Sequence, residues 1–366
     1  MAIDFKKLLL DMVPQRASDL HLKAGSVPIY RVNGDLLLIN QSPVSREDIV
    51  AIVEKILPAA LKDSLKQDGA VDFAFSIDSV TRFRTNVFYQ RGVLSVALRR
   101  LQSDHLTFQE LKLPKTVETL AKSKRGMLLI TGPTGTGKST TMAAIVDHIN
   151  SNMKKHIITI EDPIEFMFKD KMSFIDQREI GLDCPSFEQG LRHALREDPD
   201  VILIGEMRDR ETVFIAIRAA MTGHLVISTL HTINVVQTVN RIIKFFPPEE
   251  QSGLRTELGI AMRGVISQRL IPTADGKGRV PCVEIMIINE LIRKLIREDK
   301  IEDMIQVIKN RMDGMQSFDQ SLIDLYQQKL ITLETGIEFA EDVPSFKRMA
   351  EGGFSGGDRS SILSGF

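Results

Sequence analysis

One short segment constrains this chain more than any other, because it dictates both a local fold and a ligand. The segment reads Gly132-Pro133-Thr134-Gly135-Thr136-Gly137-Lys138-Ser139-Thr140. It follows the apolar stretch 127–131 and precedes a helical pattern over 139–150. A buried strand that leads through a glycine loop into a helix is the context of a phosphate-binding P-loop. Its backbone N–H groups and the positive end of the helix would surround phosphate oxygens.

Two side chains at the end of this loop have expected roles. Lys138 would reach the β- and γ-phosphates, and the hydroxyl of Ser139 would hold Mg²⁺. A chance match in irregular chain is the alternative, but a strand, loop and helix in register argue against it. We therefore expect the chain to bind a nucleoside triphosphate together with Mg²⁺.

The composition limits the other function classes. The 366 residues contain 47 Lys and Arg against 48 Asp and Glu, so no global field attracts nucleic acid. Cys184 and Cys282 lie far apart and cannot form a zinc knuckle or a disulfide framework. No apolar run reaches the ~18 residues of a membrane span, and the first residues lack a signal-peptide core. We expect a cytoplasmic protein of two or three domains that inserts no segment into a membrane.

The periodicity of apolar residues changes along the chain. Residues up to about 102 predict an α+β module whose strands include 70–77, 81–89 and 93–101. Short, continuously apolar strands then alternate with helices, as in a parallel sheet covered on both faces. From about residue 247 the pattern is mostly helical, interrupted by a hairpin over 265–271 and 279–285. The expected fold class is α/β with a smaller N-terminal α+β domain and a helical C-terminal region.

Acidic residues follow two of the apolar strands. Glu161 comes directly after the strand 156–160, and Glu206 follows 201–204. Gly205 stands where a Walker B strand usually ends in Asp, so Glu206 becomes the leading acid. Carboxyl ends of parallel strands face the ligand crevice, where one acid would order water around Mg²⁺ and another would activate the attacking water. Solvated acids at a strand end are the alternative.

Two histidines bracket a third strand. His224 precedes and His231 follows the strand 225–230. The intervening residues separate the two rings by roughly 20 Å, which excludes a shared metal ion. His231 is expected at the crevice end, where it would sense the γ-phosphate. His224 is expected to order its own turn.

Arginines in the N-terminal module form the remaining candidate set. Arg84 and Arg99 are expected on neighbouring strands, and such residues often complete the phosphoryl charge in ring ATPases. Charges at solvated strand edges are the alternative. Arg208 and Arg218 are further candidates on the helix after Glu206.

Four longer motifs together resemble a known family. The segment 195–209 is similar to the signature of the secretion ATPase superfamily, which drives type II secretion and type IV pili. The segments 17–22, 160–165 and 314–320 narrow the resemblance to the pilus retraction ATPases of twitching motility, the PilT/PilU family. The resemblance covers residues 4 to 342.

The resemblance implies an ATP-hydrolysing homohexamer. It implies a PAS-like domain at 1–102, a linker at 103–112, a RecA-like ATPase domain with a helical region at 113–345, and a flexible tail at 346–366. It assigns Glu161 and Glu165 to an acid box, Glu206 to Walker B as catalytic base, and His224 and His231 to a histidine box. Ser139, Glu161 and Glu206 would hold Mg²⁺. Arg84 and Arg99 would reach the nucleotide.

The resemblance also implies partners and a place in the cell. The ring would work on a platform protein of the pilus machinery, peripheral at the inner membrane, and would withdraw pilin subunits. The two distant cysteines cannot build the zinc module that extension members commonly carry, which favours retraction over assembly.

Several features point to the PilU-like branch. Ile292-Arg293 lacks the alanine that usually precedes this pair in the retraction family, and Thr136 within the P-loop leans the same way. An accessory ATPase beside a paralogous motor therefore stays open, as does a nucleotide-gated scaffold with little hydrolysis. A DNA translocase is disfavoured, because near-neutral charge does not support salt-dependent DNA binding.

Overall fold

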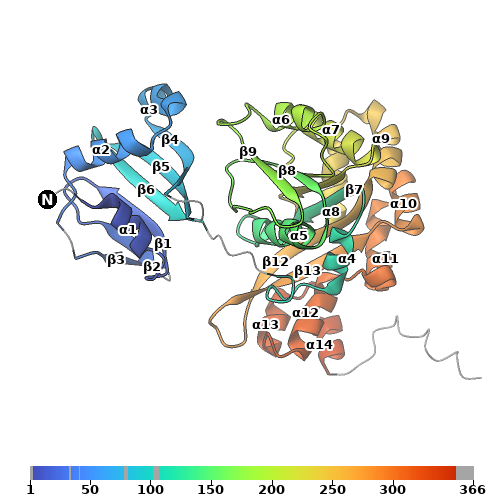
Figure 1. The fold of residues 1–366 in the computed structure, drawn as a ribbon. Helices are drawn as coiled ribbons and strands as arrows, with labels where there is room; N and C mark the ends of the chain where they lie inside the picture. Colours follow the sequence, from blue (N-terminus) through green and yellow to red (C-terminus); the bar gives the residue numbers. More distant parts are fainter. Residues whose placement is uncertain (1–2, 33, 41, 78–80, 102–106, 352–366) are drawn as a thin grey trace, which may run out of the picture. The chain divides into compact units, whose positions relative to one another are not determined.

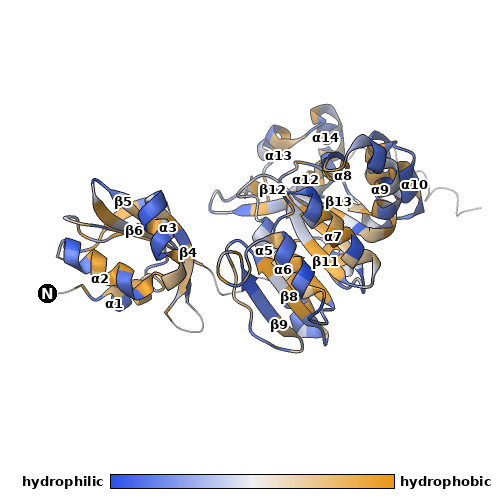
Figure 2. Ribbon diagram, turned by 90° about the horizontal axis from the view of Figure 1, so that it is seen from above, coloured by the Kyte–Doolittle hydropathy of each residue, from blue (hydrophilic) through white to orange (hydrophobic). Residues whose placement is uncertain are grey.

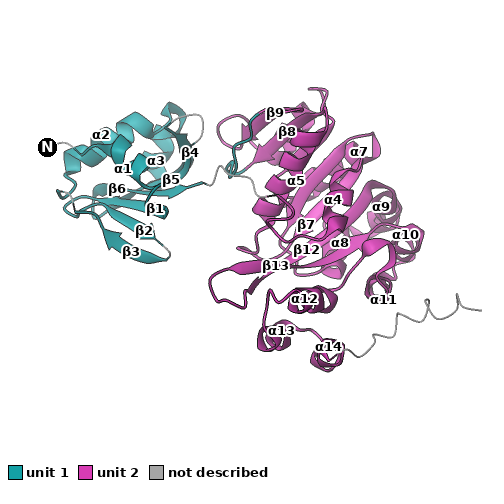
Figure 3. Ribbon diagram, turned by 60° about the horizontal axis from the view of Figure 1, so that its bottom comes forward, with its two compact units in different colours: residues 1–104, 162–169 teal, residues 105–161, 170–366 magenta. Residues whose placement is uncertain are grey.

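The computed structural model describes residues 3–32, 34–40, 42–77, 81–101 and 107–351. The chain divides into two compact units, one of residues 1–104 with 162–169 and one of residues 105–161 with 170–366 (Figure 3). The predicted linker at 103–112 lies partly outside the described residues, which resume at Thr107. Within the described ranges, no helix is both long and apolar enough to cross a bilayer.

The N-terminal unit is an antiparallel sheet with helices. Its strands are β1 (Ala17–Lys23), β2 (Ile29–Val32), β3 (Asp35–Leu38), β4 (Ala70–Ser76), β5 (Arg82–Gln90) and β6 (Val93–Arg100), in the order β3-β2-β1-β6-β5-β4. The helices are α1 (Phe5–Asp11), α2 (Arg46–Ile56) and α3 (Lys62–Asp68) (Figure 1). Along β5, Phe83 and Val87 are buried whereas Arg84 is exposed. This alternation is typical of a sheet that packs one face on a core and leaves the other in solvent.

The second unit contains a seven-stranded sheet. Its strands are β7 (Gly126–Thr131), β8 (His156–Glu161), β9 (Phe174–Glu179), β10 (Val201–Ile204), β11 (Leu225–Leu230), β12 (Met262–Pro272) and β13 (Arg279–Ile287). Their order is β13-β12-β7-β11-β10-β8-β9, and only β12 and β13 pair antiparallel. The predicted hairpin is therefore confirmed, and it extends the parallel sheet beside the P-loop strand.

Helices cover this sheet. They are α4 (Lys115–Ala121), α5 (Lys138–Asn152), α6 (Phe187–Ala194), α7 (Arg210–Met221), α8 (Val235–Lys244) and α9 (Pro248–Ala261). Every residue of β7, β10 and β11 is buried, and Figure 2 shows hydrophobic residues concentrated in the central strands. Strands buried on both faces are mostly apolar, so the charged groups lie at the strand ends and in the loops.

The C-terminal region adds α10 (Glu290–Arg297), α11 (Met304–Lys309), α12 (Phe318–Gln327), α13 (Leu333–Phe339) and α14 (Val343–Ala350). The last helix corrects the predicted start of the flexible tail at residue 346. Asp342 caps α14, Pro344 stands in its first turn, and Phe346 is fully buried beside Gly336. An apolar anchor with a cap and a proline start is enough to continue the fold. Residues 352–366 lie outside the described part.

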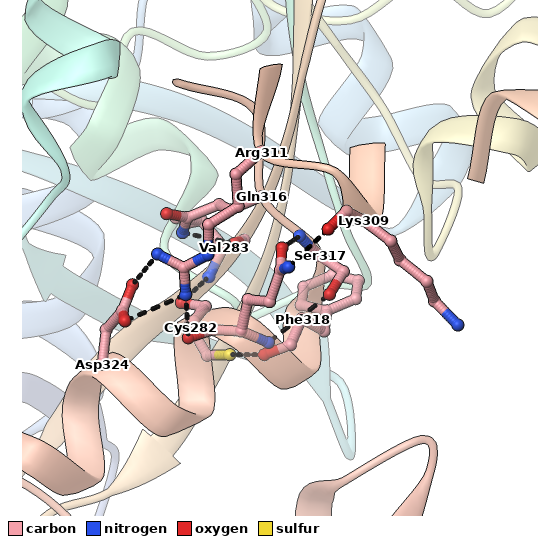
Figure 4. A network of polar contacts seen from close by, with 10 residues as sticks. Cys282, Val283, Lys309, Arg311, Gln316, Ser317, Phe318 and Asp324 are labelled. Atoms are coloured by element: carbon pink, nitrogen blue, oxygen red, sulfur yellow. Dashed lines mark hydrogen bonds and ion pairs between the residues drawn. The ribbon is translucent and has the colours of Figure 1, made fainter. Parts of the chain in front are cut away.

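The motif 314–320 fastens the outer edge of the sheet to α12. Gln316 forms an isolated bridge with Ile285 of β13, with N···O distances of 2.8 and 3.1 Å. Its side-chain amide donates to the carbonyl of Val283 at 2.9 Å, and Ser321 accepts from the N–H of Val283 at 3.1 Å (Figure 4). Ser317 closes a capping box at the start of α12. The motif thus replaces the missing neighbour of an edge strand.

Candidate nucleotide-binding site

The strand order brings the predicted site residues to one edge of the seven-stranded sheet. β7, β11, β10 and β8 are neighbours in that order and run parallel. Thr131 pairs with Leu230, and Ile204 pairs with Ser228 and Ile160. The residues that follow these strands therefore occur along the edge as P-loop, His231, Glu206 and Glu161.

The P-loop has the backbone that the glycine pattern predicts. Gly132 and Gly137 have φ values of +146° and +87°. A Cβ at Gly132 would lie 2.5 Å from the carbonyl oxygen of Gln268, and a Cβ at Gly137 would lie 2.9 Å from its side-chain nitrogen. Only glycine therefore fits at these two positions. Lys138 donates from Nζ to the carbonyls of Gly132 (2.8 Å) and Pro133 (3.0 Å). Its ammonium group thus lies across the loop that would hold phosphate.

Gln268 of β12 fastens the P-loop by hydrogen bonds, a role that was not predicted from the sequence. Its Nε2 donates to the carbonyl of Thr136 at 2.7 Å, and its Oε1 accepts from the Thr141 hydroxyl at 2.8 Å. One buried amide therefore fastens the loop before Lys138 and the helix after it. No local motif marks this glutamine, because only the pairing of β12 with β7 brings residues 127 positions or more apart into contact.

Glu206 and His231 lie side by side. The Nε2 of His231 is 3.3 Å from Oε1 of Glu206, and Nε of Arg208 donates to Oε2 at 2.9 Å. A cavity of about 290 Å³ adjoins them, lined also by Met207, Leu230, Thr232, Arg241 and Phe245. Both oxygens of this carboxylate are therefore oriented, one by the histidine and one by the guanidinium.

Glu161 occupies the next strand end. Its Oε1 accepts from the Thr159 hydroxyl at 2.7 Å and from Nε2 of Gln177 at 3.2 Å. Gly205 donates to the carbonyl of Ile160 at 2.8 Å, so the two acid segments are held in register. Three strand spacings of ~4.8 Å separate β8, which ends in Glu161, from β7 by roughly 14 Å.

The other histidine lies at the opposite end of β11. His224 Nδ1 is 3.0 Å from the carbonyl of Ala219, at the end of α7. The expectation that it orders its own turn is confirmed, and the six residues of β11 separate it from His231. The described residues contain no group of three His, Cys, Asp or Glu side chains that would hold a metal ion.

The residues present nevertheless fit Mg²⁺ bound with a nucleotide. This ion keeps several waters and takes one or two protein oxygens plus phosphate oxygens, so it needs no protein cage. Ser139 is the second residue of α5, directly after Lys138. The carboxylates of Glu161 and Glu206, both held by hydrogen bonds, would supply the outer oxygens.

Arg84 and Arg99 belong to the N-terminal unit. They are directly opposite each other on β5 and β6, and both are exposed. Nε of Arg99 donates to Asp19 at 2.8 Å, while 66% of the Arg99 side chain stays accessible. Of the two further candidates, Arg208 contacts Glu206, whereas Arg218 lies over the ring of Phe214 near the end of α7.

Known proteins match this chain over nearly its whole length. The PilU type IV pilus ATPase of Pseudomonas aeruginosa is 39% identical over 363 residues, which cover 99% of this chain and 95% of that protein. The PilT type IV pilus retraction ATPase of the same organism is 42% identical over 345 residues, with coverages of 94% and 100%. A Neisseria gonorrhoeae twitching motility protein is 44% identical over 319 residues, 87% of this chain and 85% of its own length.

Structural comparison gives the same answer. The crystal structure of the pilus retraction motor PilT with bound ADP superposes with a TM-score of 0.88 at 44% identity, covering 95% of this chain and 100% of that one. The expected fold class, a RecA-like core with a smaller N-terminal α+β domain and a helical C-terminal region, is thereby confirmed. A family model described as "Type II/IV secretion system protein" matches residues 1–279, and this chain belongs to that family.

Proposed function

We propose that this chain is a motor ATPase that hydrolyses ATP to power type IV pilus retraction and twitching motility. The observation that carries the proposal is the 42% identity to a retraction ATPase over 345 residues, which includes both units. The P-loop and the paired Glu206 and His231 supply the chemistry such an enzyme needs.

The P-loop residues 132–140 would bind the phosphates of ATP. Lys138 is the cation of the loop, and it exchanges its bonds with the carbonyls of Gly132 and Pro133 for phosphate oxygens. Ser139, Glu161 and Glu206 would hold Mg²⁺, which neutralises charge on the β- and γ-phosphates when bound.

Glu206 would orient the attacking water and accept its proton. A catalytic base must stay in one geometry, and both oxygens of this carboxylate already have partners, His231 and Arg208. His231 would donate to the γ-phosphate before hydrolysis and relax onto Glu206 afterwards. The histidine would thereby report the state of the nucleotide.

The remaining charge would come from the N-terminal unit. Arg84 and Arg99 present two exposed guanidinium groups on adjacent strands, an arrangement suited to a polyanionic ligand. We assign them to the nucleotide within a homohexameric ring. The ring would act in the cytoplasm on the inner-membrane platform protein of the pilus machinery.

Glu206→Gln tests this function. The variant should bind fluorescent ATP analogues within about twofold of wild type, yet lose about two orders of magnitude or more in turnover. It should also fail to restore twitching to a strain that lacks its own retraction ATPase. Glu211→Gln, an exposed neutral substitution five residues along, serves as control. Normal hydrolysis by the Glu206 variant would rule out Glu206 as the catalytic base.

An accessory retraction ATPase is the second candidate. The observation that favours it is the alignment with PilU, which extends over 363 residues of this chain. Complementation separates the two. A primary motor restores twitching to a strain without PilT, whereas an accessory one restores it only where a PilT-type motor remains. Steady-state hydrolysis by the purified ring then separates either motor from a scaffold.

A further inference from the structure

A buried carboxylate in β13 has no place in the phosphate chemistry described above. Glu284 is buried, with only 7% of its surface exposed. Its Oε2 accepts from the backbone N–H of Val235 at 2.7 Å, and Val235 is the first residue of α8. Burying a carboxylate costs free energy unless it is hydrogen-bonded, so the partner of Glu284 indicates what the carboxylate stabilises.

The position of Glu284 connects it to the P-loop strand. Glu284 pairs with Ser267 of β12, and Ser267 pairs in turn with Thr131 of β7, the last residue before the P-loop. Paired residues of adjacent strands project from the same face of a sheet. The hydroxyls of Ser267 and Thr131 are 2.8 Å apart, which confirms the shared face.

The same row reaches the loop that carries His231. The Thr238 hydroxyl of α8 is 3.4 Å from that of Thr131 and 2.7 Å from that of Thr232. Thr232 directly follows His231 and lines the cavity beside Glu206. The first turn of α8 is therefore held at two places, by Glu284 at its N-terminus and by hydroxyls one turn later.

The strand that carries Glu284 is held firmly. Its neighbour Val283 is hydrogen-bonded to Ser321 and to the side chain of Gln316 (Figure 4). Its other neighbour, Ile285, is hydrogen-bonded to the backbone of Gln316. Glu284 thus projects from a fixed strand toward the start of a helix whose preceding loop, 231–234, has no strand of its own.

We propose that Glu284 is a positioning residue, whose negative charge caps α8 and so fixes the loop 231–234 that presents His231 to Glu206 and the γ-phosphate. The inference rests on the proposed function, because it assigns Glu284 to the same hydrolytic site. A negative charge at a helix N-terminus stabilises the first turn, and more strongly in a buried position. Without that charge the loop populates its competent geometry less, and turnover falls while ATP affinity does not.

The ionisation of Glu284 makes the inference measurable. Burial raises the pKa of Glu284, whereas the hydrogen bond from the Val235 N–H lowers it, and the net pKa is about 7. Two further groups face it, Glu341, which raises the pKa, and Arg269, which lowers it, and these two form an ion pair with each other. Glu284 is therefore mostly protonated at pH 6 and mostly ionised at pH 8, and only the ionised form caps α8 fully.

Glu284→Gln keeps the shape and an acceptor oxygen but removes the charge. At pH 8 its kcat should be roughly three- to tenfold below wild type, with the Kd for an ATP analogue within about twofold. At pH 6 the ratio of the two kcat values should approach one, because wild type is then protonated too. The Tm at pH 8 should not fall, because the variant also loses the cost of burying a charge.

Val235→Pro removes the same hydrogen bond by changing the helix residue. It removes the N–H that Glu284 accepts, at the helix position where proline is favoured, after Asn234 in an extended conformation. Its kcat at pH 8 should fall in the same direction. Combined with Glu284→Gln, it should cost no more than about twofold further, because both remove one interaction.

Controls separate this inference from the proposed function. Glu334→Gln removes an exposed carboxylate in the first turn of another helix and should leave kcat unchanged at both pH values. Suppose that Glu206→Gln is inactive, but that the ratio of wild-type kcat to Glu284→Gln kcat is one at pH 8, or is the same at pH 6 and pH 8. The role of Glu284 is then refuted, while the proposed function stands. A parallel fall in kcat, affinity and Tm would show a merely structural role and overturn it. Normal turnover by Glu206→Gln would instead defeat the proposed function.

Discussion

The two sheets of this protein carry their functional candidates in different places. In the parallel sheet the P-loop, His231, Glu206 and Glu161 all lie at or just after strand ends, at one edge. In the antiparallel sheet Arg84 and Arg99 stand within strands, on the exposed face. A motif after an apolar strand is located by topology alone, whereas a residue on a face is located only by its register.

The two sets also differ in how they are held. Lys138, Gln268 and Glu206 are fastened by hydrogen bonds inside their own unit. Arg99 has one carboxylate partner and a largely accessible side chain. We therefore expect substitutions at the strand ends to change binding or chemistry in every state of the protein, and substitutions on the face to matter only in the assembled ring.

Lys138→Ala should have the largest effect. It removes the cation that lies across the P-loop, so ATP affinity should fall by about 100-fold or more and hydrolysis should reach background. Titration with a fluorescent ATP analogue measures the first, and phosphate release the second. Lys122→Ala, which removes an exposed lysine paired with Glu118, is the control. Unchanged affinity in the Lys138 variant would rule out the P-loop assignment and the contrast built on it.

Local patterns were enough to predict the strand ends. The P-loop, the β12–β13 hairpin and the adjacency of Arg84 and Arg99 follow from apolar runs and their spacing, and the structure has them. The edge strand β9 was not predicted, because its sequence, Phe174–Glu179, is mostly polar. An edge strand needs no continuous apolar run, so periodicity gives little signal there.

The supporting residues could not be predicted from local patterns. Gln268 and Glu284 act on residues far away in the sequence, Thr136 and Val235, and only the order of β13, β12 and β7 brings these together. Neither residue belongs to a motif of fixed spacing. The start of the tail was misplaced for a related reason, because the burial of Phe346 depends on contact with α13 rather than on composition.

Gln268→Ala should have the second largest effect on ATP affinity, after Lys138→Ala. The substitution leaves the Thr136 carbonyl and the Thr141 hydroxyl without their partner in a buried site, which costs about 1–3 kcal/mol of unfolding free energy. ATP affinity should fall roughly tenfold, because the loop is no longer fastened at both ends of Lys138. Urea unfolding and nucleotide titration measure the two effects. Gln237→Ala, an exposed glutamine on α8, should change neither, and a stable, tight-binding Gln268 variant would refute the clamp.

Arg84→Ala and Arg99→Ala test the other half of the comparison. Each should reduce turnover of the assembled ring by roughly 10- to 1,000-fold, as expected for a charge that completes a phosphoryl site. Arg84→Ala should change the unfolding free energy by no more than about 0.5 kcal/mol, because its side chain is exposed. Arg99→Ala should cost about 1–3 kcal/mol, because it leaves the buried carboxylate of Asp19 without its guanidinium partner. Arg46→Ala, an exposed arginine of α2, is the matched control. Equal turnover in all three variants would place the decisive cations elsewhere, with Arg208 as the next candidate.

A substitution of His156 should have the smallest effect. It tests whether the chemistry is confined to one edge of the sheet, because His156 begins the strand that Glu161 ends. Burial lowers the pKa of His156, but the Asp176 carboxylate at 3.0 Å and the Asp198 carbonyl raise it further, so the net pKa lies above its ordinary value. The folded state therefore holds the proton more tightly than the unfolded chain. The stability this contributes is present below about pH 6.5 and is lost as the pH rises through the higher folded pKa.

His156→Gln should remove that pH dependence at a cost of no more than about 1 kcal/mol at pH 6, because Asp176 is half exposed. Its kcat should match wild type, since the starting end of a parallel strand lies away from the crevice. A loss of turnover in this variant, measured beside its urea unfolding at pH 6 and pH 8, would mean that the chemistry is not confined to one edge of the sheet.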